Sequence, residues 1–154
     1  SLLIEELLIP RNATLLDLGC GYGPIGLVMA RLAPAGTVHM VDKDFISVEY
    51  AKKNSEMNGL TNTQTYLSNG FSMISPEVHF DVIASNLPAK PSKELYQILF
   101  EDAKRYLNPG GKFYVVVISG LKEFIKRSFT DVFGNCKKLR QGKAHCVFVA
   151  TKEN

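Results

Sequence analysis

Residues 15–26, LLDLGCGYGPIG, constrain the fold of this chain more than any other stretch. A short apolar run leads into four glycines, at Gly19, Gly21, Gly23 and Gly26. Glycine lets the backbone turn sharply and approach a ligand closely. Pro24 fits the first position of a helix, where its missing N–H is not needed, and such a helix offers free N–H groups and a positive dipole end. The stretch therefore predicts a strand, a ligand-binding glycine loop and a helix.

Strand and helix patterns alternate along most of the 154 residues, which is typical of a parallel sheet with helices on both faces. The expected strands are 14–19, 37–42, 63–68, 80–85 and 112–119, and the expected helices are 2–8, 24–33, 45–59, 92–111 and 121–133. Residues 136–141 and 144–151 read as two strands with only a short turn between them, so they must be antiparallel. We expect a single α/β domain over residues 1–154, with a mostly parallel seven-stranded sheet that ends in an antiparallel hairpin.

The composition excludes several classes of protein. No apolar stretch approaches the roughly 20 residues that span a bilayer, and the apolar N-terminus is interrupted by Glu5 and Glu6, so it is a poor signal peptide. Cys20, Cys136 and Cys146 form no CxxC pair and no metal-ligand pattern with the three histidines, which we interpret as structural or solvated. We therefore expect a cytoplasmic protein with no membrane partner and no metal site.

Positive charge gathers at the end of the chain. Residues 1–120 carry a net charge of −2, whereas residues 121–154 carry +5 and include Lys137, Lys138 and Arg140. Two interpretations remain open: a solvated face, or an edge that faces phosphates.

The glycine loop fits two kinds of cofactor. GYGPIG matches the G-x-G-x-x-G dinucleotide pattern, and Asp42, about 20 residues further on, could accept hydrogen bonds from both ribose hydroxyls. However, Asp17 and Gly19 precede this match and give D-x-G-x-G-x-G, an arrangement used around S-adenosylmethionine (SAM). No residues remain for the substrate domain of a dehydrogenase, and the closing hairpin favours a methyltransferase. A loop with a purely structural role is the remaining alternative.

LLDLGCGYGPIGL, VDKD and SNLPAK resemble motifs of the class I SAM-dependent methyltransferases. The most similar subgroup is the methyltransferase small domain family, which includes ribosomal RNA guanine-N2 methyltransferases. The resemblance covers essentially the whole chain. It implies a Rossmann-like fold, SAM as cofactor and S-adenosylhomocysteine as product.

The same resemblance assigns roles to individual residues. Asp17 would orient the glycine loop near the methionine amino group, and Asp42, in the VDKD motif with Lys43, would hold the ribose. Asn69 and Gly70, after the third strand, would contact the adenine; Asn69 replaces a frequent Asp but can still accept a hydrogen bond. The backbone near the cofactor would be that of Gly19, Cys20, Gly21 and Gly23. Cys20 is interpreted as a small loop residue rather than a nucleophile.

Asn86, Leu87 and Pro88 form an Asn-x-Pro motif at the end of the fourth expected strand. Ligands of open parallel sheets bind beyond the carboxyl ends of the strands. There the side-chain oxygen of Asn86 and the carbonyl of Leu87 could accept the two N–H groups of a target amine and aim its lone pair at the methyl group. A simple turn is the alternative.

The motif departs from the Asn-Pro-Pro of the family, since Leu87 replaces the first proline and Ala89 stands where a base-contacting residue is common. Leu87→Pro is expected to keep or improve activity if the backbone accepts the proline angle. Lys90 and Lys93, just after the motif, favour RNA as the partner.

The predicted function is therefore N-methylation of an exocyclic base amine, guanine N2, in ribosomal RNA. Protein glutamine or small-molecule methylation, and a non-catalytic SAM-binding module associated with RNA, remain as alternatives. Relatives usually carry more residues before the first helix, so a fragment without an N-terminal extension is expected. The sequence leaves the oligomeric state and the modified nucleotide undetermined.

Overall fold

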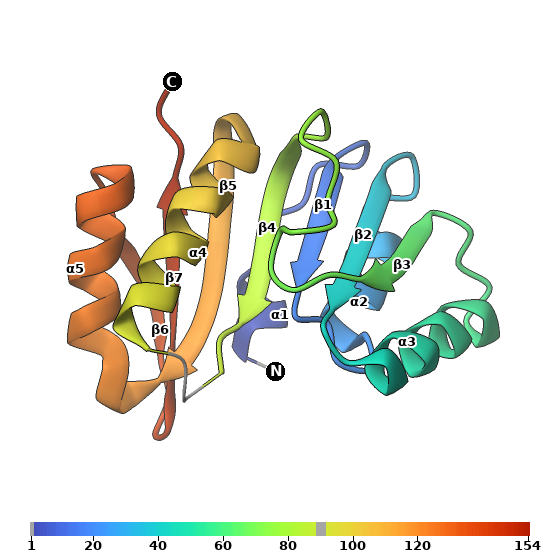
Figure 1. Cartoon of the computed structure of the whole chain (residues 1–154), viewed down its shortest axis with the longest axis horizontal. Coiled ribbons are helices and arrows are strands. Elements are labelled where there is room, and N and C mark those ends of the chain that lie inside the picture. The colour runs from blue at the N-terminus through green and yellow to red at the C-terminus, as the bar shows by residue number, and fades with distance from the viewer. Residues whose placement is uncertain (1, 89–91) are drawn as a thin grey trace.

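The computed structural model describes residues 2–88 and 92–154, without the side chains of residues 2 and 5, and places helices on both faces of one sheet (Figure 1). The strands are β1 (Thr14–Leu18), β2 (Thr37–Asp42), β3 (Thr63–Leu67), β4 (Phe80–Asn86), β5 (Leu107–Ile118), β6 (Lys137–Gln141) and β7 (His145–Thr151). The helices are α1 (Leu2–Glu6), α2 (Pro24–Leu32), α3 (Phe45–Met57), α4 (Lys93–Tyr106), the 3₁₀ turn η1 (Ser119–Leu121) and α5 (Lys122–Phe133).

The seven strands form one sheet in the order β3-β2-β1-β4-β5-β7-β6. Strands β3 to β5 in this order are parallel, β7 is antiparallel to β5, and β6 is antiparallel to β7. The chain order reverses between β1 and β4, which are neighbours although β2 and β3 separate them in sequence. In such sheets the ligand site lies at this reversal, beyond the carboxyl ends of the strands. The predicted fold, with its closing antiparallel hairpin, is confirmed.

Two apolar cores hold the layers together, one on each face of the sheet. α4 and α5 cover one face with aromatic side chains, and the ring centroid of Phe129 lies 4.9 Å from that of Phe100 and 5.5 Å from that of Phe113. On the other face α1 and α2 pack their apolar side chains on the sheet together with Ala51 of α3. Because both faces are covered, β1 and β4 are almost continuously buried, which the sequence predicted for the fourth strand.

Many boundaries differ from the sequence-based expectation by one or two residues, and the largest difference lies between α4 and β5. The fourth long helix ends at Tyr106 instead of continuing to residue 111, and β5 begins at Leu107. Leu107 already pairs with Phe80, and the register then shifts until Lys112 pairs with Val82, so the NPGG stretch is a bulge inside the strand. The first helix ends at Glu6 rather than at residue 8, and residues 7–10 are irregular. No helix within residues 2–88 and 92–154 has the length and apolar character needed to cross a membrane.

Candidate cofactor and substrate site

The predicted site residues gather at the carboxyl ends of β1, β2 and β4, the edge toward which these arrows point in Figure 1. The glycine loop leaves β1 here and is fastened to the end of β2. The N–H groups of Gly19 and Cys20 both donate to the carbonyl of Val41, at 2.9 and 2.8 Å. The loop then enters α2, whose first residue is Pro24, as the sequence predicted.

The glycines serve two different purposes in this loop. Gly19 and Gly21 have φ angles of 73° and 56°, and a Cβ placed on either would meet nothing within 4 Å. Glycine is therefore needed at these two positions for the left-handed backbone angle and not for close packing, and the space beside them is open to a ligand. Gly26 is a packing residue instead, because a Cβ there would lie 2.2 Å from the sulfur of Met40 and 3.0 Å from a carboxylate oxygen of Asp17. An open backbone cradle at a helix N-terminus fits the methionine end of SAM.

Asp17 lies under the loop and is 1% exposed. Its Oδ2 accepts a hydrogen bond from the N–H of Gly26 at 2.8 Å, which ties the end of β1 to the first turn of α2. Burial raises the pKa of this carboxyl group to about 7; the Gly26 N–H opposes the shift and the charge of Asp42 adds to it. In the ligand-free domain the Asp17 carboxyl group is therefore partly protonated near pH 7. It lies where the cationic amino group of SAM is expected to bind.

We expect Asp17→Asn to change how the stability of the ligand-free domain depends on pH. The pKa of Asp17 rises on folding, from an ordinary 3.8 to about 7, so in this window the folded state holds a proton that the unfolded state has released. The free energy of unfolding therefore falls as pH rises through the window. Asparagine lacks this titration, so the variant should gain stability relative to wild type between about pH 4 and pH 7, by a few kcal/mol in total, and the difference should be constant above.

Thermal or urea unfolding of both proteins across this pH range measures the difference. The comparison must be between variant and wild type, because burial also lowers the pKa of His39, and that group contributes stability that is lost as pH falls. A difference that does not vary with pH would mean that Asp17 is ionised throughout in the folded domain.

Asp42 organises both sides of the site. Its Oδ2 accepts from the N–H of Gly21 and its Oδ1 from the N–H of Asp44, each at 2.9 Å. Each carboxylate oxygen has a second lone pair, so the group can still accept hydrogen bonds from two ribose hydroxyls. Lys43, between the two acids, is exposed. Cys20 is buried, and burial together with Asp17 and Asp42 raises the pKa of its thiol, so it is not set up as a nucleophile.

The residues after β3 meet the same edge beside Asp42. The N–H of Ser68 donates to the carbonyl of Asp42 at 2.9 Å, and the buried Ser68 hydroxyl donates to the carbonyl of Gly70 at 2.7 Å. This turn leaves the side chain of Asn69 exposed and gives Gly70 a φ of 60°. Among the described residues no hydrogen bond uses the N–H of Gly70, which remains available to a base. The sequence analysis did not single out Ser68, although serine is a common turn residue.

Asn86 is the last residue of β4 and is exposed, while its neighbours are fixed. The hydroxyl of Ser85 donates to the carbonyl of Leu18 at 2.8 Å, which joins the ends of β4 and β1. Within the described part of the chain the side-chain amide of Asn86 makes no hydrogen bond. It can therefore serve a bound group.

Leu87 has a second role that the sequence did not indicate. Its N–H donates to the carbonyl of Val116 at 3.0 Å, and its side chain, 4% exposed, packs in the core beneath α4 and α5. A proline here would lose both the N–H and the leucine packing, so Leu87→Pro has a stability cost that the sequence-based expectation did not include. The carbonyl of Leu87 has no hydrogen-bond partner among the described residues and remains available as an acceptor.

Tyr96 fixes the far side of the motif and was missed by the sequence analysis. It lies on α4, is 2% exposed, and its hydroxyl donates a hydrogen bond to the carbonyl of Pro88. Its ring stacks on that of Phe100 at a centroid distance of 6.0 Å. Asn86 and Leu87 thus lie between two fixed points, Ser85 and Pro88. Ala89 and Lys90 lie outside the described residues.

The model of the family described as "Methyltransferase small domain" matches residues 1–149. The chain belongs to this family. It is a SAM-dependent methyltransferase domain, and the cofactor predicted from the glycine loop is confirmed for its family. The family resemblance on which the residue roles rest is confirmed as well.

Three similar proteins illustrate the relationship. The uncharacterized protein YbxB of Bacillus subtilis is 36% identical over 140 residues, which cover 90% of this chain and 69% of YbxB. Ribosomal RNA large subunit methyltransferase G of Shewanella amazonensis is 30% identical over 146 residues, 91% of this chain and 38% of the relative. A T. thermophilus 16S rRNA N2 methyltransferase, solved with AdoMet and guanosine, superposes with a TM-score of 0.83 at 30% identity. The match covers 93% of this chain and 38% of that one, so the chain spans well under half of both rRNA methyltransferases.

Proposed function

We propose that this chain methylates an exocyclic amine of a base in ribosomal RNA, with guanine N2 as the target. The observation that carries the proposal is the meeting of two groups at one edge of the sheet. By register Asp17 lies beside Ala84, so Gly19 and Asn86, two residues further along β1 and β4, leave the sheet together. A cofactor on the glycine loop and an amine at Asn86 would therefore be neighbours.

The cofactor would be held by the residues that shape the edge. The backbone of Gly19, Cys20 and Gly21 would cradle the methionine end of SAM above Asp17. Asp42 would accept hydrogen bonds from the ribose. The adenine would lie against the turn of Asn69 and Gly70, which the Ser68 hydroxyl holds in place. When bound, SAM supplies an electrophilic methyl group on a positively charged sulfur.

The substrate amine would be oriented by Asn86 and Leu87. An amine attached to an aromatic base is a poor nucleophile because its lone pair is delocalised into the ring. The oxygen of Asn86 and the carbonyl of Leu87 would each accept one of its N–H groups, which directs the lone pair toward the methyl group. Both acceptors would also stabilise the positive charge that develops on the nitrogen as the N–C bond forms and the S–C bond breaks, with its electron pair left on the sulfur of S-adenosylhomocysteine. The nitrogen would then release a proton to water.

The choice of RNA is supported by the relatives and by charge. Two of the similar proteins are named as ribosomal RNA methyltransferases, and one of these is an N2 methyltransferase that was solved with guanosine bound. The net charge of +5 in residues 121–154 fits a polyanionic substrate.

The position of the motif should depend on Tyr96. Tyr96→Phe removes the hydroxyl that donates to Pro88 but keeps the ring in the core. Displacement of the reacting groups by about 1 Å can reduce a rate by about a hundredfold, so kcat should fall by up to that factor while the KM for SAM is unchanged. Steady-state kinetics on rRNA measure both parameters.

Tyr106→Phe is a matched control for this change. It lies on the same helix, and its hydroxyl donates to the carbonyl of Ile74 at 2.8 Å, away from the motif. Both variants should lose a similar, small amount of stability, about 1 kcal/mol, but only Tyr96→Phe should lose kcat. Equal kcat in the two variants would leave Tyr96 as a core residue only.

A transfer assay with SAM labelled in its methyl group tests the proposed function. Deproteinised 16S and 23S rRNA, a protein extract and a pool of small metabolites serve as parallel acceptors. We expect label in the rRNA alone. Label in protein or in small molecules would favour the alternatives with an amide or another amine as substrate, and no transfer with normal SAM binding would favour the non-catalytic module.

A further inference from the structure

The turn between β6 and β7 lies at the same edge of the sheet as the candidate site. Asn86 pairs with Val116 of β5, and Val116 pairs with Val147 of β7. His145, the first residue of β7, pairs with Ile118, two residues beyond this level. Residues 142–144 therefore project past Asn86 on the cofactor side, and Figure 1 shows the turn as the lowest point of the fold.

This turn is braced by hydrogen bonds rather than loose. The N–H of Ser119, just after β5, donates to the carbonyl of Ala144 at 2.8 Å. The N–H of Gly142 donates to the carbonyl of His145 at 2.7 Å and closes the hairpin. The side chain of Gln141 donates to the carbonyl of Gly142 at 3.0 Å. A braced turn can hold a side chain at a fixed position relative to Asn86.

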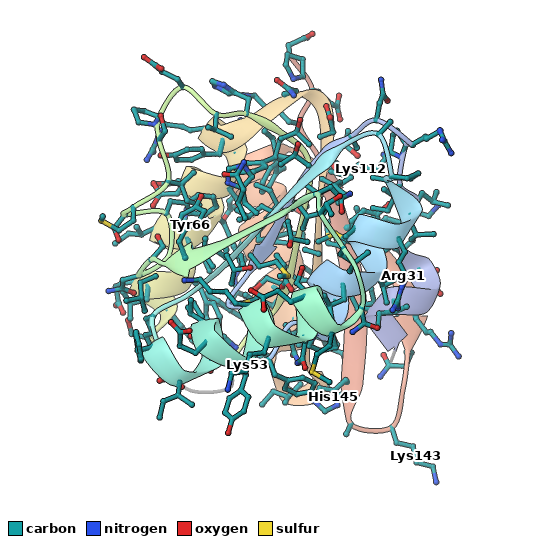
Figure 2. All side chains as sticks on the ribbon, turned by 90° about the vertical axis from the view of Figure 1, so that its right-hand side faces the viewer. Arg31, Lys53, Tyr66, Lys112, Lys143 and His145 are labelled. Carbon is teal, nitrogen blue, oxygen red and sulfur yellow. The ribbon has the colours of Figure 1, made fainter. Side chains whose placement is uncertain are left out.

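The side chain at its tip is a lysine. Lys143 is exposed, and Figure 2 shows it extending away from the ribbon. Within the described residues it makes no ion pair. Two further lysines are the first residues of helices at this edge, Lys93 of α4 and Lys122 of α5. Each first turn also contains one acid, Glu94 or Glu123, and the carboxylate of Glu123 lies 3.8 Å from the amine of Lys126. The turn thus carries positive charge beyond the candidate site.

We propose that the β6–β7 turn, with Lys143 at its tip, is a contact point for the RNA backbone next to the target nucleotide. The proposal rests on the proposed function, in which the substrate is RNA. Two strand spacings and about three residues of rise separate Lys143 from Asn86, which is about 10 Å across the sheet and about 10 Å along it. At that separation the lysine contacts phosphates outside the target nucleotide while Asn86 faces the base.

The register also separates Lys143 from the other basic residues of the hairpin. Lys138 pairs with Phe148 and Lys137 with Val149, so both lie further back along the edge strand than Asn86. Arg140 is level with Asn86 and lies 4.0 Å from Glu6 of α1. The sequence grouped Lys137, Lys138 and Arg140 as one basic segment; the fold places Lys143 foremost instead.

Two neutral variants of the same hairpin test the proposal, Lys143→Gln and Lys137→Gln. Fluorescence anisotropy with fluorescein-labelled fragments of deproteinised rRNA gives the affinity over a series of KCl concentrations. For a single-stranded RNA, log affinity falls with log salt, and each lost phosphate contact decreases the steepness of this fall by about 0.7. We expect this decrease for Lys143→Gln and an unchanged slope for Lys137→Gln, with SAM binding and melting temperature equal to wild type in both.

Equal slopes in all three proteins, or equal decreases in both variants, would overturn the proposal, because charge would then act diffusely or not at all. Failure of wild type to bind the fragments would overturn it too. Methyl transfer to rRNA by wild type is measured separately. If wild type transfers methyl groups and the Lys143→Gln slope equals that of wild type, the RNA contact at Lys143 is rejected and the proposed function is kept. If the slope depends on Lys143 but no transfer occurs, the contact is kept and the proposed function is rejected.

Discussion

Asn86→Ala is expected to abolish methyl transfer and leave SAM binding unchanged. Asn86 leaves the sheet beside the glycine loop, is exposed, and makes no hydrogen bond to the described residues through its amide. The proposed role of its oxygen is to stabilise charge that develops on the amine, so it lowers the barrier more than it improves ground-state binding. Loss of one such group reduces rates by about a hundred- to a thousandfold.

Single-turnover rates at saturating SAM measure this effect, and calorimetry measures the affinity for SAM. Asn86→Asp is the matched control, because it keeps oxygen acceptors at the same place and should retain more of the rate than alanine. An alanine variant with a near-normal single-turnover rate would return the Asn-x-Pro motif to a turn with no part in the reaction.

Asp42→Ala has the second largest expected effect, a decrease in the affinity for SAM and S-adenosylhomocysteine. The carboxylate holds the N–H groups of Gly21 and Asp44 and is the proposed ribose acceptor. Hydrogen bonds to charged groups contribute about 1.5–3 kcal/mol, so their loss should raise the dissociation constant about ten- to hundredfold. Isothermal titration calorimetry measures the change directly.

Asp44→Ala is a control that distinguishes ribose binding by Asp42 from support of the start of α3. Asp44 caps α3, since its side chain accepts from the N–H of Ile46 and the hydroxyl of Ser47. It should lose about 1 kcal/mol of stability, as cap residues do, with little change in SAM affinity. Equal losses of affinity in both variants would indicate that Asp42 only shapes the start of α3.

The part of the fold that follows from local chemistry was predictable. A left-handed backbone angle favours glycine, and the first position of a helix tolerates proline. Each preference concerns one residue, so the glycine loop and the start of α2 could be predicted from the sequence. The NPGG stretch shows the limit of such reasoning. Proline and glycine indicate a break, but only the pairing of Leu107 with Phe80 shows that the break is a bulge within β5 instead of the end of a helix.

The candidate site shows the same division. Asn86, Leu87 and Asp42 could be selected from motifs, and the structure places them at one edge. The bonds from Leu87 to Val116 and from Tyr96 to Pro88 could not, because each partner is brought close only by the packed sheet and by α4. The position of Lys143 relative to Asn86 likewise depends on the register of three strand pairs, β4–β5, β5–β7 and β6–β7.

Identification of the methylated nucleoside tests the central claim most directly. Deproteinised 16S and 23S rRNA would be incubated with the protein and labelled SAM, digested to nucleosides and separated by chromatography with mass detection. The account predicts a single labelled product with one added methyl group on an exocyclic amine, N2-methylguanosine. Label on a ring nitrogen, a carbon or a ribose oxygen would contradict the roles proposed for Asn86 and Leu87.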